Sequence, residues 1–204
     1  MIGYYNYTVY LTYAGLLSSM LGIFLAIDGS VTGAVVCLLV SGVCDMFDGK
    51  IARTKKDRTP EEKRFGIQID SLCDVVCFGV FPAVLGIAAG ARLWWQAAAA
   101  AFFVLCGVIR LAYYNVTEET RQNVSDKKRE AYTGLPITAS AILVPLLMCF
   151  SHALGDKLSH AYTALLLVMG LCYITPISVK KPGVWGAAVM IAAGALVLII
   201  IVCR

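Results

Sequence analysis

Charged residues are scarce in this chain. They make up 15% of its 204 residues, whereas hydrophobic residues make up 59%, and the mean hydropathy is +0.77. Soluble domains carry roughly a quarter charged residues, so this composition excludes a soluble globular protein. The eight cysteines lie mostly inside apolar runs and lack paired metal-ligand spacing. We therefore interpret them as small packing residues and not as a disulfide framework or a soft-metal site.

Long apolar runs fill most of the sequence instead. Each is long enough for a membrane-spanning helix of about 20 residues. We expect spans over 11–28, 31–49, 67–90, 93–115, 134–153, 159–178 and 184–203. The predicted fold is all-α, a polytopic transmembrane helical bundle that forms one domain over 1–204, with six core spans and an extra C-terminal span. Pro82, Pro145 and Pro176 are expected at helix kinks or ends.

The basic residues are distributed unevenly between the two sides of these spans. Of the 17 Lys and Arg residues, 14 fall at 50–64, 110–129 and 180–181, which the span order places on one side. The positive-inside rule makes that side cytoplasmic. The N-terminus, with its five tyrosines between residues 4 and 13, is predicted to lie on the same side.

Four aspartates flank the basic segment that follows the second span. Asp45 and Asp48 are spaced i, i+3, and Asp70 and Asp74 are spaced i, i+4, so each pair shares one helix face. If one helix ends near Gly49 and the next begins near Gly66, all four carboxylates converge at one membrane surface. The helix dipole then favours the second pair and disfavours the first.

Four converging carboxylates repel one another unless cations lie between them. Carboxylate oxygens are hard ligands that suit Mg²⁺ or Mn²⁺. Four of them can hold two ions, as in two-metal sites that act on phosphoryl groups. The sequence therefore predicts a divalent-metal site with ligands Asp45, Asp48, Asp70 and Asp74.

These residues carry a family resemblance. The pattern DxxDGxxAR followed by GxxxDxxxD resembles the signature of the CDP-alcohol phosphatidyltransferases, and it is matched here by Asp45, Asp48, Gly49, Ala52, Arg53, Gly66, Asp70 and Asp74. One departure is the spacing. Twelve residues separate Arg53 from Gly66, more than the family usually has, and we expect the extra residues within Lys55–Lys63.

The resemblance implies an activity and a role for each motif residue. It implies a homodimeric membrane enzyme that takes CDP-diacylglycerol and uses Asp74 as the base for the attacking alcohol. The residues implied in CDP-diacylglycerol binding are Thr12, Asp45, Gly49, Ala52, Arg53 and Gly66. An arginine can hold pyrophosphate oxygens bidentately, and small residues let a nucleotide approach a helix closely.

A second sequence pattern indicates which branch of this family the chain resembles. Arg110 and Asn115, followed by the sequence Gly134-Leu135-Pro136, are similar to the RLxxxN…GLP pattern of phosphatidylserine synthases, and the stretch 70–82 also resembles that branch. This implies L-serine as acceptor, with Arg110 and Asn115 in acceptor binding. The two patterns together cover about 8–145. We expect a prokaryotic cell membrane protein with its active site on the cytoplasmic face and no nucleic acid partner.

Two alternatives stay open at this stage. The same transfer to glycerol 3-phosphate or an inositol phosphate would use further basic residues near the site, and the cluster at 121–129 keeps that reading open. A cation transporter would also use membrane carboxylates, but transporters place their sites near the bilayer midplane, often at broken helices. Here the aspartates are predicted at helix ends beside a basic loop.

Overall fold

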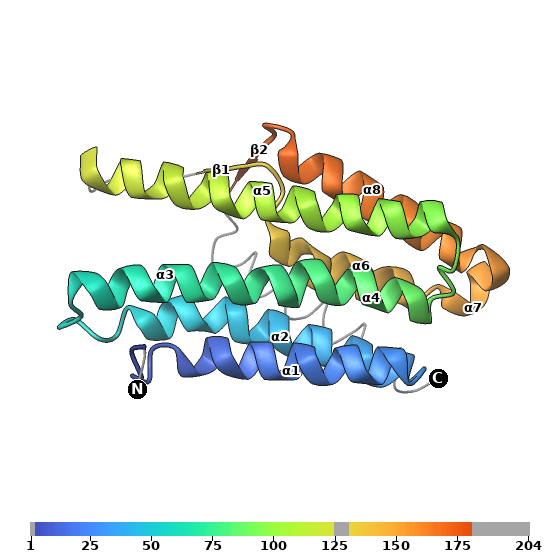
Figure 1. The fold of residues 1–204 in the computed structure, drawn as a ribbon, viewed down its shortest axis with the longest axis horizontal. Coiled ribbons are helices and arrows are strands. Elements are labelled where there is room, and N and C mark those ends of the chain that lie inside the picture. Colours follow the sequence, from blue (N-terminus) through green and yellow to red (C-terminus); the bar gives the residue numbers. More distant parts are fainter. Residues whose placement is uncertain (1–2, 125–130, 181–204) are drawn as a thin grey trace.

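A bundle of roughly parallel and antiparallel helices makes up the computed structural model, which describes residues 3–124 and 131–180, with side chains described for 3–119 and 134–177. The helices run along one long axis, with α5 and α8 on one side of the bundle and α1 on the other (Figure 1). In chain order the elements are α1 (Tyr10–Ile27), α2 (Val31–Ala52), α3 (Pro60–Asp74), η1 (Val75–Val80), α4 (Phe81–Ala88), α5 (Trp94–Val124), β1 (Ala131–Thr133), η2 (Ile137–Ala139), α6 (Ser140–Met148), α7 (Ser151–Leu154), η3 (Gly155–Lys157), α8 (Leu158–Ile174) and β2 (Ser178–Lys180).

The predicted polytopic helical membrane fold is confirmed, with a short strand pair beside the helices. Five helical segments are long and apolar enough to cross a membrane, namely Tyr10–Ile27, Val31–Ala52, Pro60–Ala88, Trp94–Glu119 and Ser151–Ile174. The span expected over 134–153 is shorter, because the apolar helix there covers only Ile137–Met148. The expected last span, 184–203, lies outside the described residues. The chain is an integral membrane protein.

Small residues bring α1 and α2 close together. The buried residues of α1 are Thr12, Gly15, Ser19, Gly22 and Ala26. They repeat at helical spacing and form a stripe of small side chains, the usual way for membrane helices to approach closely. Within this interface the Ser41 hydroxyl donates to the carbonyl of Gly15 at 2.9 Å and lies 2.8 Å from the Ser19 hydroxyl. The first two helices therefore form a tightly packed pair.

The third span is one continuous helical segment with a π-helical turn in its middle. α3, η1 and α4 follow one another from Pro60 to Ala88, and the π-helix η1 begins directly after Asp74. Pro82 has no backbone N–H, so the carbonyl of Phe78 loses its usual helical donor. The Ser140 hydroxyl of α6 donates to that carbonyl at 3.0 Å, and the Tyr162 hydroxyl of α8 donates to the Pro82 carbonyl at 2.7 Å. These bonds fix the irregular part of the helix against its neighbours.

The start of this helix differs from the sequence prediction. α3 begins at Pro60 and not near Gly66, and α2 ends at Ala52 and not near Gly49. A capping box explains the early start, because the Thr59 hydroxyl accepts from the Glu62 backbone and the Glu62 carboxylate accepts from the Thr59 backbone. The loop between the two helices is therefore only 53–59. The Thr-Pro-Glu-Glu sequence carries this signal, which the sequence analysis missed.

A short two-stranded antiparallel pair adds to the helices. β1 pairs with β2, with Tyr132 opposite Val179. Just after β1, Gly134 adopts a positive φ of 81°, and a Cβ there would lie 2.8 Å from the Tyr173 carbonyl oxygen. The Leu135 N–H donates to the Cys172 carbonyl at 3.1 Å. In the structure, the Gly134-Leu135-Pro136 sequence thus docks the start of η2 onto the end of α8.

The close packing of α1 leads to a stability prediction. A Cβ on Gly22 would overlap Cζ of the fully buried Phe81 ring and would lie 2.8 Å from Cβ of Cys37. We therefore expect Gly22→Ala to lower the free energy of unfolding in detergent by about 1–3 kcal/mol, through overpacking. Gly49→Ala is the control, because nothing lies within 4 Å of its Cβ position. Equal unfolding midpoints for the two variants would contradict the close approach at Gly22.

Candidate active site and metal centre

Three carboxylates meet between α2 and α3. One oxygen each from Asp45, Asp70 and Asp74 lie within 4.8 Å of one another. The i, i+4 spacing puts Asp70 and Asp74 on the face of α3 that looks toward α2. Asp45 comes from α2, which lies beside α3 in the bundle (Figure 1). Asp45 thus meets Asp70 and Asp74, although they lie at least 25 positions further along the sequence.

Asp48 lies beside this group but has a different environment. Its side chain is 7% exposed, and the Thr12 hydroxyl of α1 donates to Asp48 Oδ2 at 3.0 Å. Its carboxyl group also lies within hydrogen-bonding reach of that of Asp70, just as the carboxyl of Asp45 does with that of Asp74. The four aspartates therefore face one another in two pairs across α2 and α3.

A small cavity lies next to the carboxylates, between α1, α2 and α3. Its volume is about 10 Å³, room for about one water molecule. The lining residues are Thr12, Gly15, Ser41, Cys44, Asp45, Asp48, Cys73, Asp74, Cys77 and Phe78. Because the residues around the aspartates are mostly small, the carboxylates can approach one another without steric obstruction.

This arrangement is electrostatically unfavourable without a cation. Carboxylates within hydrogen-bonding reach of each other repel, and the partly buried setting screens them poorly. The donor set consists of carboxylate oxygens, which suit a hard divalent cation. Asp45, Asp70 and Asp74 therefore fit such an ion, with Asp48 close enough to Asp70 to add a ligand or to hold a second ion.

The helix dipole does not contribute in the way the sequence suggested. Asp70 and Asp74 lie ten and fourteen residues after Pro60, well beyond the first turn of α3, where the dipole effect is concentrated. The first turn holds Glu61 and Glu62 instead. The expectation that the N-terminus of this helix favours the second aspartate pair is therefore wrong, and a cation would have to supply the stabilisation instead.

Arg110 of α5 approaches the carboxylates from the other side. Its side chain is 8% exposed, and its charge acts on both Asp45 and Asp74. The guanidinium carbon lies 5.9 Å from the centroid of the Tyr114 ring. A buried arginine in a membrane span requires an anionic environment, which these aspartates supply.

Asn115 makes a contact that sequence reasoning missed. Its Nδ2 donates to the Ser71 hydroxyl at 2.9 Å, and that hydroxyl lies 3.2 Å from Asn115 Oδ1. Ser71 follows Asp70 directly on α3, so the pair links α5 to the aspartate-bearing helix. A serine next to a motif aspartate is too common a feature to have been singled out from the sequence.

The remaining predicted residues surround the end of α2. Gly49 is exposed with open space in front of it, and Arg53 is an exposed residue immediately after α2. The Ala52 carbonyl accepts a hydrogen bond from Arg58 at 3.2 Å. Gly66 is covered by the same arginine, because a Cβ there would lie 2.5 Å from Arg58 Nη2. Arg58 is a second residue that the sequence analysis did not single out.

The chain belongs to the CDP-alcohol phosphatidyltransferase family, whose sequence model matches residues 5–201. The match extends beyond the region 8–145 that carries the two motif patterns, so the resemblance is not limited to those spans. Members of this family catalyse phosphatidyl transfer and are generally dependent on divalent metals. The carboxylate group described above fits that dependence.

Individual relatives share parts of the sequence. Archaetidylserine synthase of Methanothermobacter thermautotrophicus is 35% identical over 128 residues, which are 62% of this chain and 51% of the relative. CDP-diacylglycerol–serine O-phosphatidyltransferase of Saccharomyces cerevisiae is 36% identical over 108 residues, 52% of this chain and 38% of the relative. The enzyme of the same name from Helicobacter pylori strain 26695 is 29% identical over 171 residues, 81% of this chain and 68% of the relative. The chain thus spans about half the length of the first relative and less of the second.

The carboxylate group leads to a binding prediction. Asp70→Asn removes one of the three clustered oxygens and the partner of Asp48, so we expect Mn²⁺ affinity to fall at least about tenfold, as for the loss of a charged ligand contact. Electron paramagnetic resonance of free Mn²⁺ measures this in purified protein. Asp28→Asn is the control, because Asp28 follows α1 at the opposite end of the bundle. If both variants bind Mn²⁺ like the wild type, the cluster is not a metal site.

Proposed function

We propose that this protein transfers a phosphatidyl group from CDP-diacylglycerol to L-serine and releases phosphatidylserine and CMP. The observation that carries the proposal is the meeting of Asp45, Asp70 and Asp74 across α2 and α3, with Arg110 beside them. The family match and the relatives named for serine transfer support it. The transporter alternative loses its basis, because the chain belongs to a family of phosphatidyltransferases.

Asp74 is the base in the proposed reaction. The serine hydroxyl loses its proton to the Asp74 carboxylate as its oxygen forms a bond to the β-phosphorus. The bond between that phosphorus and the bridging oxygen breaks, and the electron pair leaves with CMP. The four aspartates would hold one or two divalent cations, Mg²⁺ or Mn²⁺. When bound, these would supply positive charge against the pyrophosphate. A positioned base raises the rate of such a step by about 10²–10⁴-fold.

The acceptor side is formed by α3 and α5. Arg110 carries a planar guanidinium that fits the carboxylate of an amino acid, and it is already held near Asp74. Asn115, fixed by Ser71, presents amide groups next to the same helix. A single buried arginine suits a monocarboxylate better than a phosphate dianion, which favours serine over glycerol 3-phosphate or an inositol phosphate.

The nucleotide side is formed by the end of α2 and the start of α3. Thr12 holds Asp48, and Gly49 leaves open space in front of its helix. Ala52, Arg53 and Gly66 follow around the same end. These residues form the proposed site for the CDP group, while the diacylglycerol part remains in the bilayer.

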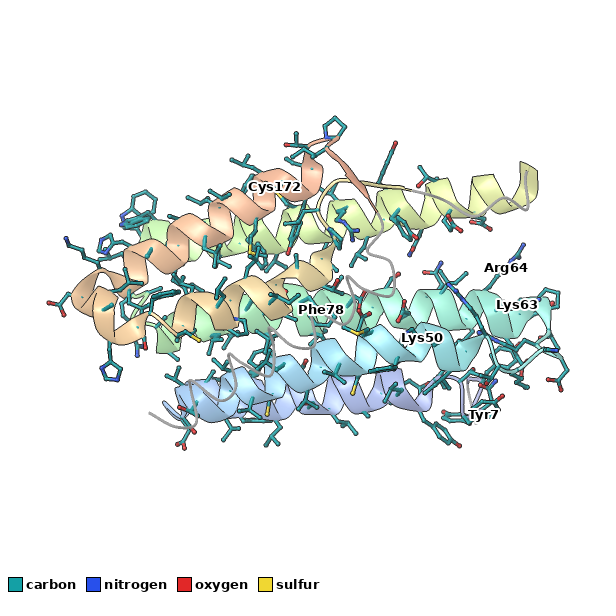
Figure 2. All side chains as sticks on the ribbon, turned by 180° about the vertical axis from the view of Figure 1, so that it is seen from behind. Tyr7, Lys50, Lys63, Arg64, Phe78 and Cys172 are labelled. Atoms are coloured by element: carbon teal, nitrogen blue, oxygen red, sulfur yellow. The ribbon has the colours of Figure 1, made fainter. Side chains whose placement is uncertain are left out.

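We also propose that this end of the bundle faces the cytoplasm of a prokaryotic cell. Figure 2 shows Lys50, Lys63, Arg64 and Tyr7 together at this end, and Arg92 and Lys157 belong to the segments at the other end. The positive-inside rule supports this orientation.

We further propose that the protein forms a homodimer, as the family resemblance implies. Cross-linking in native membranes tests this.

The direct test is CMP release from CDP-diacylglycerol by the purified protein with Mg²⁺ or Mn²⁺. We expect release with L-serine and little with glycerol 3-phosphate, an inositol phosphate or no acceptor. Asp74→Asn should reduce kcat by about 10²–10⁴-fold, because it keeps the shape of the side chain and removes the base. If CMP is released with glycerol 3-phosphate but not with serine, glycerol 3-phosphate is the acceptor and the serine assignment is wrong. If Asp74→Asn keeps full activity, Asp74 is not the base.

The acceptor assignment leads to a separate prediction. Arg110→Lys keeps the charge but loses the planar fork, so we expect a KM for serine raised about tenfold or more with little change in the KM for CDP-diacylglycerol. Steady-state CMP release with each substrate varied in turn measures both. Lys157→Gln at the opposite end of the bundle is the control. A higher KM for CDP-diacylglycerol with an unchanged KM for serine would place Arg110 in the phosphate site.

A further inference from the structure

Arg58 lies in the loop 53–59, between the end of α2 and the start of α3. Its Nη1 donates to the Ala52 carbonyl at 3.2 Å, and its Nη2 donates to the Glu62 carbonyl at 3.3 Å. The same Nη2 would lie 2.5 Å from a Cβ on Gly66. The guanidinium group therefore rests against Gly66 and joins the two helix ends that carry the aspartate motif.

The charge of this guanidinium is not balanced by a carboxylate within the described residues. Both of its hydrogen-bond acceptors are neutral carbonyls, and Nε is buried with no hydrogen-bond partner in the described part of the chain. The nearby Glu62 carboxylate is engaged by Lys55 at 3.0 Å. An arginine has five N–H donors, so donors remain for an anion. A positive charge that no carboxylate balances attracts an anion, and the Nη hydrogens not used by the two carbonyls can donate to it.

The loop that carries Arg58 is held firmly in place. The Glu62 carboxylate accepts hydrogen bonds from Lys55, from the Asn6 side chain and from the Thr59 backbone. The Tyr7 hydroxyl lies 3.1 Å from the hydroxyl of Thr54, close to the α2 end of the loop. A preorganised donor loses little conformational entropy when it binds a ligand. Arg58 is thus held between the end of α2 and the start of α3 and is not a freely moving surface residue.

We propose that Arg58 binds a phosphate oxygen of the CDP group, an additional contact beyond the motif residues. The inference rests on the proposed function, because it assigns a residue to the nucleotide side of that site. Arg58 contacts both Ala52 and Gly66, two positions assigned to that side. The absence of a side chain at Gly66 then makes room for the guanidinium, which in turn meets the phosphate.

A purely structural role is the competing explanation. Arginine side chains often hydrogen-bond the last carbonyls of a helix, as Arg58 does with Ala52. Such a cap would affect the stability of the protein but not its affinity for a nucleotide. Binding and melting must therefore be measured on the same variants.

The experiment is calorimetric titration of CDP into the purified full chain in detergent with Mn²⁺. We expect Arg58→Gln to weaken CDP binding on the order of 10- to 100-fold, as for loss of a charge-assisted hydrogen bond, with only a small drop in melting temperature from the two lost carbonyl contacts. Arg58→Lys keeps the charge and should recover most of the affinity. Lys56→Gln is the matched control, because it removes one exposed positive charge from the same loop and should change the affinity less than about twofold.

Several outcomes would overturn the inference. Three results would leave Arg58 with only a structural role. The first is that Arg58→Gln binds CDP with wild-type affinity, and the second is that it loses no more affinity than Lys56→Gln does. The third result is a loss of affinity that comes with a much lower melting temperature and that Arg58→Lys does not restore. An equal loss for cytidine, which has no phosphate, would move the contact to the nucleoside. The proposed function would be contradicted if the wild-type protein binds CDP but releases no CMP with any acceptor. In that case the binding titration would still decide whether Arg58 contacts the phosphate.

Discussion

Repulsion among the four aspartates is the constraint on which the rest of the site depends. Asp45 and Asp48 on α2 face Asp74 and Asp70 on α3, and three of the carboxylates approach within 4.8 Å. Few arrangements of fixed negative charge are less favourable in a setting of low dielectric constant. The structure keeps them together by packing, hydrogen bonding and the nearby charge of Arg110, and the remaining imbalance fits a divalent cation. In the proposed reaction, such a cation would also offset the charge of a pyrophosphate.

The framework around the aspartates explains why they cannot move apart. The small residues of α1 let it pack closely on α2, and Thr12 of α1 holds Asp48 directly. On the other helix, the π-helical turn begins after Asp74, and Ser140 and Tyr162 bond the carbonyls around Pro82. π-Helical turns are frequent at functional sites, where they change the direction of the side chains that follow. Three neighbouring helices thus fix the two helices that carry the carboxylates.

The helical type of the spans and the positions of the first six could be predicted from the sequence, because apolar runs of span length have few other solutions. The seventh expected span lies outside the described residues. The approach of the aspartates could also be predicted, since i, i+3 and i, i+4 spacing determines the helix face. Helix boundaries could not be predicted as well. α3 begins six residues before Gly66 because of the Thr59 capping box, a local signal that the charged composition of the loop obscured.

Contacts between distant segments were harder still to predict. Two such contacts are Ser71 with Asn115 and Arg58 with Ala52. They depend on how helices or loop ends pack, and no local sequence pattern predicts either pair. The Gly134-Leu135-Pro136 sequence was useful as a family pattern, but its physical role became clear only when it was seen against the end of α8.

The outer faces of α2 and α3 show how a lipid substrate fits this geometry. Val43 and Phe47 alternate with Asp45 and Asp48 along α2, and Leu72 lies between Asp70 and Asp74; all three apolar side chains are exposed. Each helix therefore has carboxylates on its inner face and hydrocarbon-facing side chains on its outer face. The proposed donor has the same division, since its acyl chains belong in the bilayer and its pyrophosphate belongs with the cation. A substrate that enters sideways between lipid and protein can keep its acyl chains solvated by hydrocarbon while only its headgroup crosses to the aspartates. In the proposed reaction, the bilayer itself would thus serve as the apolar half of the site.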